Sequence, residues 1–234
     1  MVGIGGVVVA PALIHVSGMA PQHALSIAMG GFVATGVFGL VSFARNSYGV
    51  RRADAVLLGG ALIGAVFGSL IVAAVSPVAA KLFIAIVSLW AGVTSLRSSR
   101  ALSEAAESAF GSAVAAIVGL FVGVGSAASG TGGPLLLLPV LLWKGVNARY
   151  AIALAQAIQL PIALAATATN SILGVPAVPE ALYLGFGLLI GMQVGMRLLP
   201  LVPISVLRRG LAVSIMGVAV VMAIQAIRQA LQTT

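Results

Sequence analysis

The sequence of 234 residues contains no cysteine, only 12 Lys and Arg, and only four Asp and Glu. The absence of cysteine excludes disulfides, thiol chemistry and thiolate metal sites. All four acidic residues lie near the ends of apolar segments, which argues against a carboxylate proton relay within a membrane. The sequence shows no nucleophile–base pair and no cluster of metal ligands. We therefore expect neither an enzyme nor a cofactor.

Apolar residues, in contrast, make up 61% of the chain, and the mean hydropathy is +1.19. Soluble domains of this length do not have such a composition. Ala, Leu, Val and Gly continue for long runs without the alternation of a strand, so the fold class is an all-α polytopic membrane protein. The basic residues lie in short loops that set topology, and the net charge of +8 therefore indicates a lipid bilayer rather than nucleic acid as partner.

The apolar segments lie on both sides of a polar linker at residues 97–107. They are Met1–Val16, Ala24–Ala44, Ala53–Val75, Val78–Leu96, Ala109–Ala127, Pro134–Trp143, Ala148–Leu173, Ala181–Leu199 and Ile204–Ala230. Each long segment approaches the ~20 residues that cross a bilayer core. Pro134–Trp143 covers only about half of the core. It predicts a half-helix, or a re-entrant hairpin with the segment before it.

A glycine run before Pro134 interrupts the apolar region, and a similar run opens the chain. Neither can continue a helix, and broken backbone survives in lipid only where protein or a water-filled cavity satisfies it. A half-helix that begins after such a break points N–H groups into the protein and suits an anion. The candidate substrate-binding residues at the two breaks are Gly5, Gly6, Ser126, Ser129, Thr131, Gly132 and Gly133. The alternative is that these glycines only permit close helix packing.

Three glutamines within apolar segments are further candidates for substrate binding. Gln156 and Gln159 stand three positions apart, on one helical face just before Pro161. Gln193 lies between two glycines of a later segment. Buried amides often mark a transport pathway, but they also form hydrogen bonds that hold helices together, and both interpretations stay open.

For several other polar and small residues we expect a structural role rather than a role in substrate binding. Asn170 and Thr167 lie nearer the predicted outer end of their segment. Arg197 is expected to reach the inner interface with its long side chain. Close helix packing is the expected role of two glycine pairs, Gly64 with Gly68 and Gly191 with Gly195.

The two sides of the linker share residues at a constant offset of 127 positions. Gly60, Leu62, Ile63, Gly64 and Gly68 match Gly187, Leu189, Ile190, Gly191 and Gly195, and the pairs Gly5–Gly132, Gly6–Gly133, Gly18–Gly145 and Ala24–Ala151 share the same register. This agreement predicts two repeats, residues 1–107 and 108–234, within a single membrane domain. The first repeat starts almost at its glycine break. We therefore expect its first helix to be shortened, by a misassigned start codon or by genuine loss.

The positions of the basic residues predict that the two repeats are inverted. Most Arg residues lie at segment ends that one topology makes cytoplasmic, and this topology places loop 45–54 inside and loop 172–180 outside. These two loops occupy equivalent places in the repeats. Inverted repeats with glycine-interrupted segments are typical of secondary transporters, whose site lies at the repeat interface. We expect the anion near mid-membrane, between the two breaks.

The glycine breaks that lead to Pro11 and Pro139, with GMAPQHALS at residues 18–26 and GVNARYAIA at 145–153, resemble the TauE/SafE family of membrane transporters. The likeness covers nearly the whole chain. Two features depart from the family pattern: the shortened start, and TGGP where a third glycine is usual.

The resemblance implies export of a small anion, sulfite or an organosulfonate such as sulfoacetate, across the bacterial cytoplasmic membrane. A homodimer remains open. The alternatives to a carrier are a channel-like anion pore and a membrane scaffold or accessory subunit that transports nothing.

Overall fold

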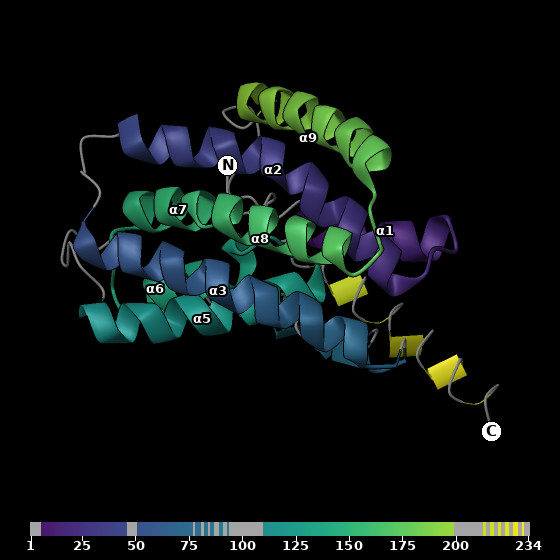
Figure 1. The fold of residues 1–234 in the computed structure, drawn as a ribbon. Helices are drawn as coiled ribbons and strands as arrows, with labels where there is room; N and C mark the ends of the chain where they lie inside the picture. The colour runs from purple at the N-terminus through teal and green to yellow at the C-terminus, as the bar shows by residue number, and fades with distance from the viewer. Residues whose placement is uncertain are drawn as a thin grey trace.

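A computed structural model describes residues 6–45, 51–76 and 110–198, with isolated helical stretches of one to three residues within 78–93 and 213–231. The described residues form helices joined by turns, as Figure 1 shows, so the all-α prediction is confirmed. Within these residues, helices long and apolar enough to cross a membrane are Pro21–Arg45, Arg52–Ala74, Ser112–Ser129, Arg149–Ile172 and Val178–Gly195. The protein is therefore a polytopic membrane protein.

The helices follow the predicted segments closely. They are α1 (Gly6–Val16), α2 (Pro21–Arg45), α3 (Arg52–Ala74), α5 (Ser112–Ser129), α6 (Pro134–Trp143), α7 (Ala148–Ala157), α8 (Gln159–Ile172) and α9 (Val178–Leu198). One predicted helix is divided between α7 and α8 at Ile158, because Pro161 has no N–H to bond the preceding turn. The bounds of the segments predicted at Val78–Leu96 and Ile204–Ala230 lie outside the described residues.

Helices α3 and α5 pack backbone against backbone through their glycines. A methyl group added to Gly64 would meet the carbonyl oxygen of Leu120, and one added to Gly68 would meet that of Val124. Because the residue numbers rise in both helices from one contacting pair to the next, α3 and α5 are parallel. The prediction that Gly64 and Gly68 allow close packing is confirmed. At Gly191, in contrast, no described atom lies within 4 Å of an added methyl group.

Helix α2 lies in the middle of the bundle, between α8 and α9, as Figure 1 shows. A methyl group added to Gly36 would lie 2.8 Å from Leu160 Cα, and one added to Gly39 would lie 2.6 Å from the Gln156 carbonyl oxygen. From the first pair to the second, the residue number rises in α2 and falls in its partner, so α2 is antiparallel to α7 and α8. Residues 148–172 are the equivalents of α2 in the predicted repeat, and a predicted inversion of the two repeats requires such antiparallel directions. The relation by an axis in the membrane plane stays a prediction.

Each half contains a short helix with an internal proline. Pro11 lies inside α1, and Pro139 lies inside α6. Each short helix is followed by a glycine with positive φ, Gly18 at 64° and Gly145 at 78°, before a long helix begins. The equivalent turns support the predicted duplication at the level of backbone conformation.

Aromatic and charged residues join α2, α3 and α7 at one end of the bundle. The rings of Phe43 and Tyr150 meet edge to face at 5.8 Å, and the Arg51 guanidinium lies 5.5 Å from the centre of the Tyr150 ring. The backbone N–H of Arg51 donates to the buried Asp54 carboxylate at 3.0 Å. These contacts bring together helix ends rich in arginine, which we call the inner end. The opposite end is called the outer end.

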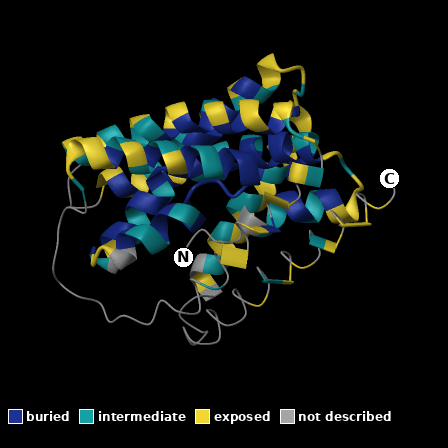
Figure 2. Cartoon of the chain, turned by 90° about the horizontal axis from the view of Figure 1, so that it is seen from below, coloured by how far each residue is buried: buried dark blue, intermediate teal, exposed yellow. Residues whose placement is uncertain are grey.

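Buried residues face the centre of the bundle and exposed residues face away from it, as Figure 2 shows. Many of the exposed side chains are large and apolar, including Phe67, Phe121 and Phe186. Lipid is the solvent that covers such a surface in a membrane protein.

Candidate functional site

The predicted interruption lies between α5 and α6. Gly130 ends α5 in the left-handed conformation, with φ 71° and ψ 23°, and its N–H bonds to the carbonyl of Ser126. The N–H of Thr131 bonds to the same carbonyl at 3.2 Å. This glycine-dependent arrangement caps the end of a helix. Residues 126–135 are all buried, as broken backbone in a membrane requires.

The hydroxyl groups of the break differ in what they offer a ligand. Ser129 Oγ donates to the Gly125 carbonyl at 2.6 Å and lies 3.0 Å from Thr131 Oγ1. A hydroxyl has one proton to donate, so Ser129 accepts the bond from Thr131. Ser126 Oγ, also fully buried, has no hydrogen-bond partner in the part of the chain that the structure describes. Ser126 is therefore the hydroxyl that is ready to bind a ligand.

Two glycines leave backbone donors open at the start of α6. Gly132 has φ 75° and Gly133 has φ 110°, conformations that L side chains rarely adopt. Among the described residues, no group accepts a hydrogen bond from the N–H of either glycine. A methyl group added to Gly132 would lie 3.0 Å from Phe32 Cδ2 and 3.2 Å from Gln159 Nε2. One added to Gly133 would lie 2.9 Å from Ile158 Cγ2.

The break lies at the middle depth of its neighbours. Phe32 is the twelfth of the 25 residues of α2. Gln159 is the eleventh of the 24 residues of the span Arg149–Ile172. Because both side chains lie against Gly132, the start of α6 is about halfway across the bundle. Its N-terminal dipole end, roughly half a positive charge, acts at this depth.

Helix α1 reaches the same place from the other half. A methyl group added to Gly130 would lie 2.7 Å from Cβ of Ala10, which is itself fully buried. Helix α1 begins at Gly6, about one turn and ~6 Å before Ala10. The second turn of α1, which contains Ala10, therefore lies against Gly130. Gly5 lies outside the described residues.

Two predicted candidates are placed elsewhere. Gln156 is half-buried, with its backbone against Gly39 of α2. Gln193 is exposed on α9 and lines a separate groove of about 270 Å³ with Arg197. The structure thus brings Gln159, which is 4% exposed, to the break and does not bring Gln193 there. The interruption at Ile158 lies between Gln156 at the end of α7 and Gln159 at the start of α8.

The walls of the site include residues that the sequence alone did not indicate. Phe32, Ile158 and Leu25 all lie within 3.0 Å of methyl groups placed on the break glycines. Their apolar side chains look the same in sequence as lipid-facing ones. One signal was available for Phe32: in the predicted repeat it stands 127 positions before Gln159, at the equivalent place.

Comparison with known families shows which family the chain belongs to. The family model described as Sulfite exporter TauE/SafE matches residues 1–222. The chain belongs to the TauE/SafE family. The resemblance carried by the glycine breaks and their flanking motifs is thereby confirmed, and this TauE/SafE protein is a membrane transporter. Among curated proteins and solved structures, no match to the chain is found.

Proposed function

We propose that this TauE/SafE protein is a secondary transporter that exports a small oxyanion across the bacterial cytoplasmic membrane by alternating access. The substrate is sulfite or an organosulfonate such as sulfoacetate. The observation that carries the proposal is the buried break at mid-depth, with the open N–H groups of Gly132 and Gly133. Ser126 Oγ and the Gln159 amide add two neutral donors nearby.

The electrostatics of the break suit an anion that must bind and then leave. An ion that enters a low-dielectric interior loses several kcal/mol or more of hydration free energy, which protein groups must replace. No Lys or Arg lies within residues 1–44 or 101–143, so no full cation of these segments is available. Backbone donors and the start of α6 supply partial positive charge instead. Such a site binds moderately, as turnover requires.

The location of the break supports alternating access. Phe32 and Gln159 are equivalent positions of the two predicted repeats, and both lie against Gly132. The predicted axis between the two repeats would therefore pass close to the site, at the repeat interface where secondary transporters bind substrate. Phe32 and Gln159 closely cover Gly132, so we infer that the anion enters when these side chains rotate away.

A thermal-shift screen with sulfite, sulfate, thiosulfate, sulfoacetate and taurine tests binding. Stabilisation by sulfite or sulfoacetate is expected, because a ligand that binds only the folded state raises its stability. Saturable flux with counterflow in proteoliposomes then distinguishes a carrier from a channel-like pore. If none of these compounds stabilises the protein and none is transported, the scaffold alternative is favoured.

A further inference from the structure

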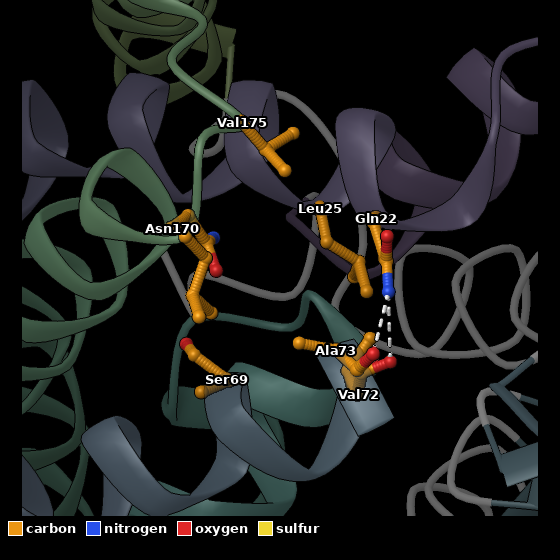
Figure 3. A pocket seen from close by; sticks show the side chains of 9 residues that line it. Gln22, Leu25, Ser69, Val72, Ala73, Asn170 and Val175 are labelled. Atoms are coloured by element: carbon orange, nitrogen blue, oxygen red, sulfur yellow. Dashed lines mark hydrogen bonds between the residues drawn. The ribbon is translucent and has the colours of Figure 1, made fainter. Parts of the chain in front are cut away.

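We propose that a cavity at the outer end of the bundle is a second binding site for the transported oxyanion, an outer vestibule closed from the glycine break by Leu25. The nature of the ligand rests on the proposed function. The cavity has a volume of about 250 Å³ and lies between α2, α3, α5 and α8. Figure 3 shows Ser69 and Asn170 on one side and Gln22 on the other, with Leu25 between them.

The lining offers polar groups to a ligand. Ser69 is only 4% exposed, and its Oγ has no hydrogen-bond partner among the described residues. A buried hydroxyl is rarely left without a partner, so water or a ligand is expected to complete it. The side-chain amide of Asn170 lines the same side of the cavity. Both side chains can donate hydrogen bonds to an oxyanion.

The negative ends of three helices, α3, α5 and α8, lie at this cavity, and terminal carbonyls of each accept hydrogen bonds; in α5 the Ser126 carbonyl does so. Gln22 Nε2 donates to the terminal carbonyls of α3, at 3.1 Å to Val72 and 3.3 Å to Ala73. At the end of α8, the N–H of Val175 bonds to the Asn170 carbonyl at 3.0 Å. Uncapped carbonyls would repel an anion. With these bonds made, neutral donors dominate the lining, and weak binding that permits release is expected.

A thin layer of side chains separates the cavity from the break. Leu25 lines the cavity, is 2% exposed, and has Cδ2 2.5 Å from the position of a methyl group on Gly130. Ala127 also lines the cavity and directly follows Ser126, whose Oγ has no hydrogen-bond partner among the described residues. An anion released from the break toward this end therefore has to pass Leu25.

The equivalent place at the inner end is occupied differently. Phe43 is the repeat equivalent of Asn170, 127 positions earlier, and its ring packs against Tyr150. Arg51 lies over the other ring of this pair. A cavity at the outer end together with aromatic packing at the inner end is the asymmetry of an outward-facing carrier.

The natural absence of cysteine makes this proposal testable in the full chain. Ser69→Cys is labelled in proteoliposomes with membrane-impermeant methanethiosulfonates of opposite charge. Ser17→Cys, at an exposed residue near the same end, is the matched control. The ratio of the anionic reagent's rate to the cationic reagent's rate is expected to be at least as high at Ser69→Cys as at Ser17→Cys. Sulfoacetate at several times its Kd should slow this reaction by roughly fivefold, and only at Ser69→Cys.

Sulfoacetate is used because sulfite itself consumes thiol reagents. An unreactive Ser69→Cys, a strong preference for the cationic reagent, or protection by sodium ions in place of sulfoacetate would each overturn the vestibule. Anion flux of the unmodified protein is measured in the same vesicles. If flux is absent, the proposed function fails. If flux is normal and Ser69→Cys is unreactive or unprotected, the vestibule alone fails.

The closing role of Leu25 has its own test. Ser126→Cys is fully buried and is expected to resist the anionic reagent in the outward-facing protein. Adding Leu25→Ala should raise its rate of modification by about tenfold or more, while Leu164→Ala, at an exposed leucine of α8, should not. Thermal unfolding of each variant shows whether it is folded. A folded Leu25→Ala variant that leaves Ser126→Cys unreactive would refute the gate.

Discussion

Replacing Gly132 with alanine separates the binding of ligand by the backbone from the strain of the backbone. Its φ of 75° is nearly that of Gly145, at 78°, so Gly145→Ala is a matched control. The left-handed conformation costs a residue with a Cβ about 1–2 kcal/mol in either place. Among the described residues, no atom beyond the chain neighbours lies within 4 Å of a methyl group on Gly145, whereas Phe32 and Gln159 crowd the one on Gly132. The two variants thus share the strain and differ in what the methyl group covers.

We expect a loss of stability in both variants, larger at Gly132 because crowding adds to the strain, and a loss of anion binding at Gly132 alone. Strain of that size lowers the melting temperature of a domain of this size by about 2–8 °C in both variants. At Gly132 the methyl group also crowds Phe32 and Gln159, the side chains that we infer must rotate before an anion reaches the backbone N–H. A hydrogen bond to a charged group is worth about 1.5–3 kcal/mol, so losing one weakens anion binding roughly 10- to 100-fold. Gly145→Ala should bind the anion normally.

The assay is the anion-dependent thermal shift of each purified variant, followed by flux in proteoliposomes. A larger side chain gives a stronger test, because Gly132→Val is expected to abolish binding. Equal anion affinity in the Gly132→Ala and Gly145→Ala variants would refute the reasoning. The glycines would then serve packing alone.

Three further outcomes are expected. Gln159→Leu should lower anion affinity about tenfold through the loss of one donor, whereas Gln156→Leu should leave it unchanged; equal effects measured by thermal shift would contradict the assignment of Gln159. Gly64→Ala should destabilise the protein by about 2 kcal/mol or more, because its methyl group meets a carbonyl of α5, and an unchanged melting temperature would contradict this packing. Ser47→Cys and Val175→Cys should be labelled from opposite sides of the membrane, and labelling from one side would disprove the inverted topology.

Helix existence and the interruption at residues 130–133 could be predicted because their causes are local. Apolar length sets a membrane span, and glycines before a proline end a helix whatever surrounds them. The division at Ile158 escaped prediction, although Pro161 was visible, because a proline in a membrane helix gives a kink or a break according to its neighbours. The place of Gln193 was also not predictable, since its glycine neighbours say nothing about which face of α9 meets the bundle.

By itself, the sequence determined the membrane class, the all-α fold, the short helix after the break and membership of a transporter family, all properties of composition, length and local backbone. Only the tertiary structure decided which side chains cover the break. Phe32, Leu25 and Ala10 look in sequence like any lipid-facing residue, and close packing of α2 and α1 makes them walls. The same holds for Ser69 and Asn170, which line one cavity because α3 and α8 end side by side. Such contacts join residues about 100 positions apart, and no local pattern of the chain encodes them.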